Sequence, residues 1–157
     1  MEKIVNILLV EDDLISQKLA KILLNKKGWM VTTASDGLAA VKAAESVVFD
    51  IILMDVKLPI MDGFEATKII KEHYNFNSKS VPVVAVTACA MKGDKETCLK
   101  QGMDDYLSKP FTSEALYAVV LKHLNHKQIY LPKILSETKV ANLYYVLFLS
   151  CWLLLDG

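Results

Sequence analysis

Acidic side chains follow two apolar segments of this sequence, and other polar side chains follow later ones. Glu11 and Asp12 come after the first segment, Asp55 after another, and Thr87 and Lys109 after two more. If these segments are neighbouring strands, three carboxylates meet, and like charges in a partly buried site raise one another's pKa. Lys109 would compensate part of this charge. Mg2+ would compensate the rest, because it binds carboxylates and waters and leaves a position for a phosphate oxygen.

The apolar segments that must position these residues alternate with segments whose apolar residues recur at helical spacing. Five short runs are predicted to be strands: residues 4–10, 29–33, 50–54, 81–86 and 106–108. Helices are predicted over residues 15–27, 37–45, 62–71, 88–101 and 112–124. Strand–helix repeats with short connections predict an α/β fold, a doubly wound five-stranded parallel sheet with five helices on its two faces. Ligands of such sheets bind beyond the carboxyl ends of the strands, where the polar residues fall.

The turn after the first predicted strand argues against direct nucleotide binding. Folds that hold a nucleotide phosphate directly use a glycine-rich turn there, whereas this chain has no glycine before Gly28. The carboxylates of Glu11 and Asp12 would repel a phosphate unless a metal stood between them. A haloacid-dehalogenase-like phosphatase would need a second aspartate two residues after Asp55, and that position is Lys57. Metal-dependent phosphoryl chemistry is therefore favoured.

Four motifs in order resemble the receiver domain of two-component response regulators. They are LLVED at residues 8–12, MDVKLPIMDG at 54–63, VTA at 86–88 and YLSKPF at 106–111. The resemblance covers about residues 3–126, and the four motifs together are highly specific. It implies the flavodoxin-like receiver fold. It also implies phosphorelay signal transduction, in which a phosphohistidine donor phosphorylates Asp55 in a Mg2+-dependent reaction and the conformation then changes.

The resemblance also implies a set of metal ligands around Asp55. Asp55 would be the phosphoacceptor, forming an aspartyl phosphate. Asp12 and Asp55 would bind Mg2+ directly, Glu11 through water, and Lys57 through its backbone carbonyl. Receivers accept Asp or Glu at the position of Glu11, so the longer side chain stays within the family pattern.

Three further residues receive roles from the same resemblance. Thr87 would donate its hydroxyl to a phosphoryl oxygen and Lys109 would pair with another, which offsets charge on the transferring group. Tyr106 would be the switch aromatic whose rotamer follows Thr87. The peptide bond between Lys109 and Pro110 is expected to be cis.

These roles describe a signalling switch that catalyses its own phosphorylation and dephosphorylation rather than a turnover enzyme. The expected partner is a sensor histidine kinase or a histidine phosphotransfer domain. The sequences of the motifs resemble those of receivers attached to hybrid kinases. A phosphorylation-independent interaction module of the same fold is the alternative. The intact residues Asp55, Thr87 and Lys109 favour the phosphoacceptor. Whether the protein forms a homodimer stays open.

Other polar residues are interpreted structurally. Asp13 is predicted to be either a solvated surface acid or a helix cap. Asp62 is a predicted helix cap, and Glu65 completes a capping box with it. Asp50 opens a strand and receives no catalytic role. The histidines have no partner spacing and are predicted to lie on the surface: His73, His123 and His126. Two methionines are predicted packing residues: Met91 and Met103.

Composition limits the classes of partner and the compartment. The chain has 18 basic and 18 acidic residues, so nothing indicates direct nucleic-acid binding. Three cysteines without CxxC spacing argue against a disulfide framework or a zinc site and favour a reducing compartment. The first apolar run is too short for a signal peptide. A cytoplasmic location is therefore expected.

The end of the chain does not follow the receiver pattern. We expect a receiver domain at residues 1–127 and a hydrophobic extension of open role at 128–157. Residues 140–155 carry no charge, but sixteen residues fall short of the roughly 20 needed to span a bilayer. Three interpretations stay open: a helix packed on the receiver or on a second subunit, a membrane-associating segment, or sequence not native to the domain. The first is favoured and membrane association is disfavoured.

Overall fold

The computed structural model of this protein describes residues 4–77, 79–88 and 93–124. The chain divides into two units at residue 123, and the account below concerns the first. The predicted extension at 128–157 lies outside the described residues, as do Met91 and His126. No helix in the described part of the chain is long and apolar enough to cross a membrane.

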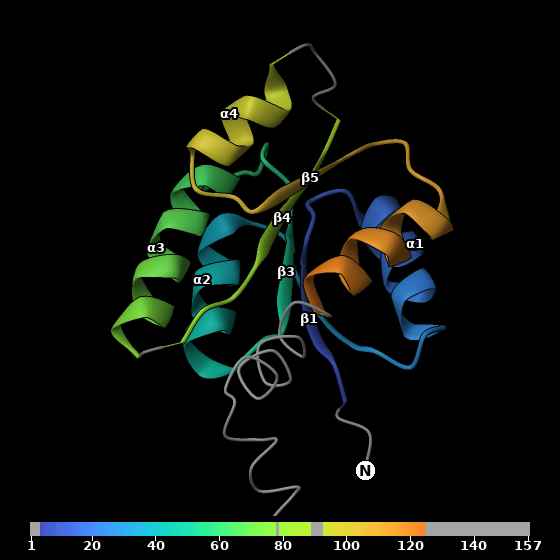
Figure 1. The fold of residues 1–157 in the computed structure, drawn as a ribbon, viewed down its shortest axis with the longest axis horizontal. Coiled ribbons are helices and arrows are strands. Elements are labelled where there is room, and N and C mark those ends of the chain that lie inside the picture. Colours follow the sequence, from blue (N-terminus) through green and yellow to red (C-terminus); the bar gives the residue numbers. More distant parts are fainter. Residues whose placement is uncertain (1–3, 78, 89–92, 125–157) are drawn as a thin grey trace, which may run out of the picture. The chain divides into compact units, whose positions relative to one another are not determined.

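Five parallel strands form one sheet in the order β2-β1-β3-β4-β5. The strands are β1 (Asn6–Val10), β2 (Met30–Ala34), β3 (Ile51–Met54), β4 (Val83–Thr87) and β5 (Asp105–Ser108). The helices are α1 (Leu14–Asn25), α2 (Gly37–Ser46), α3 (Gly63–Phe76) and α4 (Asp94–Lys100), and residues 113–124 are also helical. The helices α2 and α3 cover one face, while α1 and helix 113–124 cover the other (Figure 1). The doubly wound α/β prediction is therefore confirmed.

The strands that carry the site are buried on both faces. Every residue of β3 and β4 is buried, and so are four of the five residues of β1. Helices on both sides of a parallel sheet produce this pattern, which is why continuous apolar runs predicted these strands. The edge strand β2 instead alternates between exposed and less exposed residues. The central strands thus give the site a rigid base.

Aspartate side chains cap the helices that begin at the site. Asp13 accepts a hydrogen bond from the backbone N of Ser16 at 2.8 Å, at the start of α1. Asp62 accepts from the backbone N of Phe64 and of Glu65, at 2.8 and 2.9 Å, at the start of α3. Such bonds satisfy amide donors that the first helical turn leaves unpaired. The cap predicted for Asp62 is confirmed, and of the two roles left open for Asp13 the structure shows the cap.

Some predicted boundaries were wrong. The helix α3 continues to Phe76 rather than ending near residue 71. It continues because Tyr74, on its last turn, is buried and its hydroxyl accepts a hydrogen bond from the backbone N of Phe49 at 3.0 Å. In the described residues α4 begins only at Asp94, behind a left-handed Gly93 (φ 105°), and not directly after β4.

The prediction of surface histidines was wrong for His123. Its side chain is 12% exposed, and its Nε2 lies 3.0 Å from Oδ2 of the buried Asp105. His73 is half-buried beside the ring of Tyr74. Met103 is buried in the core, as predicted for a packing residue.

Candidate functional site

The site forms because β1 and β3 are neighbours with their ends level. Val10 pairs with Met54, so the residues that follow them, Glu11 and Asp55, leave the sheet side by side. The backbone N of Asp55 continues the ladder with a hydrogen bond of 3.0 Å to the carbonyl of Val10. The side chains of both acids thus meet at the carboxyl edge, where open α/β sheets bind ligands.

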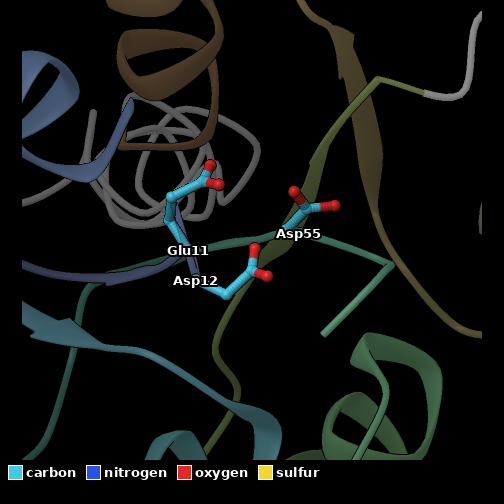
Figure 2. A group of neighbouring side chains, drawn as sticks. All are labelled: Glu11, Asp12 and Asp55. Carbon is cyan, nitrogen blue, oxygen red and sulfur yellow. The ribbon is translucent and has the colours of Figure 1, made fainter. Parts of the chain in front are cut away.

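Three carboxylates converge at this edge. Single carboxylate oxygens of Glu11, Asp12 and Asp55 all lie within 4.8 Å of one another (Figure 2). Glu11 and Asp55 are buried, with 5% and 6% of their surface exposed, whereas Asp12 is exposed. The cluster therefore has a buried side, formed by two acids, and an open side toward solvent.

Lys109 supplies the cation of the site. Its Nζ lies 2.5 Å from Oδ2 of Asp55 and also contacts Oε2 of Glu11. The lysine reaches them from beyond β5, where its backbone N donates a hydrogen bond of 2.9 Å to the carbonyl of Thr87. The peptide bond between Lys109 and Pro110 is cis, as expected from the sequence. One ammonium group therefore bridges the ends of β1 and β3.

Burial and charge act against each other in this ion cluster. Burial raises the pKa of Glu11 above its usual value, and the hydrogen bond from Lys109 offsets only part of that rise. Burial would lower the pKa of Lys109, but hydrogen bonds to Asp55 and Glu11 outweigh it, so the pKa is raised. Lys109 is thus held in its charged form.

Thr87 and Tyr106 occupy neighbouring strands beside the cluster. Thr87 is buried at the last position of β4, level with Ser108 of β5. Tyr106 pairs with Ala85, which places it two residues back from the edge, where it is half-buried against the core. The structure therefore brings Thr87 to the edge and places Tyr106 two residues behind it.

The loop after Asp55 folds closely onto that residue. The backbone N of Lys57 donates a hydrogen bond of 3.2 Å to Oδ1 of Asp55, while the Lys57 side chain is exposed. The backbone N of Gly63 bonds to the carbonyl of Val56 at 2.9 Å. A Cβ at Gly63 would lie 2.1 Å from the backbone oxygen of Asp55, so only glycine lets α3 begin this close.

The carboxylate cluster fits a small divalent cation. Three carboxylates against one ammonium leave two negative charges unbalanced when all groups are ionised. The donors are all hard oxygens, which suit Mg2+. Opposite ligands of octahedral Mg2+ lie roughly 4.2 Å apart, so oxygens spread over 4.8 Å need only small side-chain movements.

Comparison with known proteins identifies the family. The family model of the response regulator receiver domain matches residues 7–121, most of the chain. The chain belongs to this receiver domain family. The recognition made from the four sequence motifs is therefore confirmed.

Curated relatives carry such a receiver within much longer chains. Hybrid signal transduction histidine kinase I of Dictyostelium discoideum is 44% identical over 119 residues, 73% of this chain and 7% of that protein. The transcription factor SKN7 of Candida albicans is 41% identical over 119 residues, 76% of this chain and 21% of that protein. The chain therefore spans only a small part of these relatives.

Solved structures agree with the fold and report ligands of receiver relatives. The receiver domain of sensor histidine kinase PA1611 from Pseudomonas aeruginosa is 41% identical, with a TM-score of 0.71 over 78% of this chain and 99% of that one. That structure contains a magnesium ion coordinated in the active-site cleft. The Ssk1 receiver of Saccharomyces cerevisiae, co-crystallised with the histidine phosphotransfer protein Ypd1, is 32% identical, with a TM-score of 0.69 over 74% of this chain and 86% of that one.

Sequence reasoning missed two residues, Gln17 and Asp105, whose polar contacts join helices to the sheet. Gln17 donates from Nε2 to the backbone carbonyls of Glu11 and Ala34, at 2.8 and 3.2 Å. At the start of β5, Asp105 contacts Lys122 and His123 on the following helix. The motif signals could not reveal these pairs, because both depend on how the helices pack against the sheet.

Proposed function

We propose that this receiver accepts a phosphoryl group on Asp55 from a phosphohistidine donor, in a Mg2+-dependent reaction, and then changes conformation. The observation that carries the proposal is the position of Asp55. Its buried carboxylate contacts Lys109 and lies within reach of two other acids at the open edge of the sheet. A lone surface aspartate would have none of these neighbours.

In the proposed step, a carboxylate oxygen of Asp55 attacks phosphorus in line. A P–O bond forms while the P–N bond of phosphohistidine breaks, and the electron pair of that bond returns to the ring nitrogen. The imidazole leaves as the neutral base, because water protonates its other ring nitrogen. Lys109 offsets charge on one phosphoryl oxygen, and the Thr87 hydroxyl donates to another. Lys109 is already held at 2.5 Å from Asp55, so it needs no long movement.

Asp12, Asp55 and Glu11 would hold Mg2+, with the backbone carbonyl of Lys57 as a further ligand. The ion would supply two positive charges at the oxygens of the transferring group. The donor chemistry and unbalanced charge of the cluster support this assignment, and so does the ion in the related PA1611 receiver.

The change of conformation is assigned to Thr87 and Tyr106. Thr87 lies beside the site and Tyr106 lies on the adjacent strand, half-buried, so movement at one can change the packing of the other. Phosphorylation would then favour a different surface around β4 and β5.

The donor is proposed to be a protein, either a sensor histidine kinase or a histidine phosphotransfer domain. The first turn of α1 directly follows Asp12 and Asp13 and exposes large apolar side chains: Leu14 is 63% and Ile15 79% exposed. Two adjacent exposed apolar residues beside a charged site support a protein contact there. The Ssk1 receiver's complex with Ypd1 supports this class of partner.

A division of the chain and a cellular compartment are also proposed. We assign residues 1–127 to the receiver and 128–157 to an extension, in a cytoplasmic protein or in the cytoplasmic part of a hybrid kinase. Cell fractionation tests the compartment, and recovery of the chain outside the cell would contradict it.

Acetyl phosphate with Mg2+ tests the phosphoacceptor directly. The wild-type protein should gain the mass of one phosphoryl group in an acid-stable, hydroxylamine-labile form, and Asp55→Asn should gain none. Asp62→Asn is the matched control, because it makes the same change seven residues away and asparagine caps a helix about as well as aspartate. Equal labelling of Asp55→Asn would refute the assignment. A folded wild type that gains no phosphate would favour a phosphorylation-independent interaction module.

Phosphorylated Ypd1 tests the class of donor. Radiolabel should move from Ypd1 to the wild-type receiver and not to Asp55→Asn, and it should move faster than from acetyl phosphate at equal concentration, because docking raises the local concentration of donor. A receiver labelled by acetyl phosphate but no faster by Ypd1 would argue against a docked protein donor.

A further inference from the structure

An apolar cavity lies beside the ion cluster, on the face of the sheet that α1 and helix 113–124 cover (Figure 1). Its volume is about 350 Å³, within the roughly 300–1,000 Å³ that is typical of small-molecule sites. Leu9 and Leu53, which pair across β1 and β3, line its sheet side, and Leu116 of helix 113–124 lines its helix side. All three leucines are buried. The walls of the cavity are therefore mainly aliphatic.

Short side chains on α1 explain why this space is not filled. Ser16 and Ala20 lie one helical turn apart and both line the cavity. Protein interiors normally contain few voids larger than a water molecule, so a space of this size is unusual in a packed core. Leu19 also lines the cavity and is 56% exposed, so the cavity reaches the surface beside it. A small molecule can therefore enter without unfolding of the helix.

One end of the cavity is charged. Glu11 and Lys109 line it, whereas the other two clustered carboxylates, Asp12 and Asp55, are not part of its lining. Oε2 of Glu11 accepts a hydrogen bond from Lys109, and Oε1 accepts a longer one, 3.3 Å, from the backbone N of Asp13. A carboxylate oxygen has room for a further donor. Because the cluster holds three carboxylates and one ammonium group, this end attracts a cation and repels an anion.

We propose that this cavity binds a small apolar molecule that carries one amine group. Its apolar body would contact the three leucines, and its ammonium group would donate a hydrogen bond to Oε1 of Glu11. Aliphatic walls favour a hydrocarbon body, and the excess of carboxylates favours a cationic group. The inference goes beyond the proposed function, since it requires neither phosphate nor a protein donor. Because Glu11 also contacts Lys109, the ligand would touch the ion cluster that includes Asp55.

Three phenyl probes of similar size and different charge test the proposal: 2-phenylethylamine, 2-phenylethanol and 3-phenylpropionate. NMR titration of the 15N-labelled protein in metal-free buffer should give saturable shifts of the backbone amides of Leu19 and Ala20, which line the cavity. The amine should bind about five- to tenfold more tightly than the alcohol, and the acid most weakly, because only the amine is attracted by Glu11. The proposal is overturned if the amine gives no saturable shifts below about 10 mM or if the acid binds as tightly as the amine.

Two substitutions test the two parts of the site separately. Ser16→Leu should fill the cavity from its rim and weaken binding of both the amine and the alcohol about tenfold. Ser16 is only partly buried, so the fold should accept a leucine there. Ser46→Leu, the same change at the exposed last residue of α2, is the matched control and should leave both affinities unchanged.

Glu11→Gln tests the charged end, because glutamine nearly keeps the shape of glutamate without its charge. The substitution should remove the preference for the amine over the alcohol and leave binding of the alcohol in place. A preference that persists in Glu11→Gln, or wild-type affinities in Ser16→Leu, would show that the probes bind elsewhere and would overturn the proposal.

An apolar side chain of the phosphodonor protein is the competing occupant. In that case Ser16→Leu would slow transfer from phosphorylated Ypd1 relative to labelling by acetyl phosphate, and the probes would not bind. This result would overturn the small-molecule site and leave the proposed function in place. Absence of acetyl phosphate labelling in the wild-type protein would instead refute the proposed function, without changing the binding of the probes.

Discussion

At the scale of single residues, burial and hydrogen bonding act on Asp105 in opposite directions. Burial would raise the pKa of this carboxyl group. Hydrogen bonds from Lys122, from the backbone N of Tyr106 and from His123 outweigh burial and lower the pKa from 3.8 to about 2. The contacts are short, at 2.6 Å to Lys122 and 3.0 Å to His123. Asp105 therefore stabilises the folded state only in its ionised form.

The lowered pKa of Asp105 predicts an acid-dependent part of the stability. A carboxyl group with a lower pKa in the folded state stabilises the fold above its unfolded pKa, and this contribution is lost as pH falls from about 4 toward 2. Asp105→Asn should reduce the free energy of unfolding by roughly 1–2 kcal/mol at pH 7, after allowance for the solvent exposure of Lys122. The difference from wild type should shrink on going to pH 3. Urea denaturation at both pH values measures it.

Glu72→Gln provides the control for net charge. Glu72 is an exposed carboxylate on α3, so the substitution removes one negative charge without breaking the Asp105 contacts. It should not reproduce the loss seen at pH 7. A difference between Asp105→Asn and wild type that is equally large at pH 3 and pH 7 would show that shape, and not ionisation, determines the effect.

At the scale of elements, β5 is an edge strand held by charges at both ends. Asp105 at its start binds the helix 113–124, and Lys109 just beyond its end binds the acids that follow β1 and β3. The sequence predicted the Lys109 end, because the motif and the strand-end rule both place that lysine at the edge. It did not predict the Asp105 end. Lys122 and His123 lie 17 and 18 residues away on another element, so no periodicity within one helix or strand connects them to Asp105.

The same distinction between local and long-range contacts explains which elements were predicted well. Buried parallel strands are continuous apolar runs, so β1, β3 and β4 could be read from their residues. The end of α3 could not, since it depends on the contact between Tyr74 and Phe49 across the fold. The positive φ of Ile60, 68°, was also invisible to sequence reasoning, because isoleucine gives no signal for a positive-φ turn.

At the scale of the whole molecule, the site exists only when the fold is complete. Glu11, Asp55 and Lys109 are far apart in the sequence and come from the ends of three different strands. A cation that binds the three-carboxylate cluster therefore binds the folded chain and not the unfolded one. Such binding raises stability by mass action.

Magnesium should accordingly raise the melting temperature of the wild-type protein. At a concentration ten times the dissociation constant, the gain is about 1.4 kcal/mol, and it should grow with the logarithm of concentration. Asp12→Asn should remove most of this gain, because it deletes a carboxylate from the open side of the cluster while leaving the pairs of Lys109 with Glu11 and Asp55 in place. Glu72→Gln should keep it. Melting curves that do not depend on Mg2+ would contradict the metal assignment. In that case Lys109 alone would compensate the negative charge of Glu11 and Asp55. Phosphorylation of Asp55 would then have to proceed without the divalent ion.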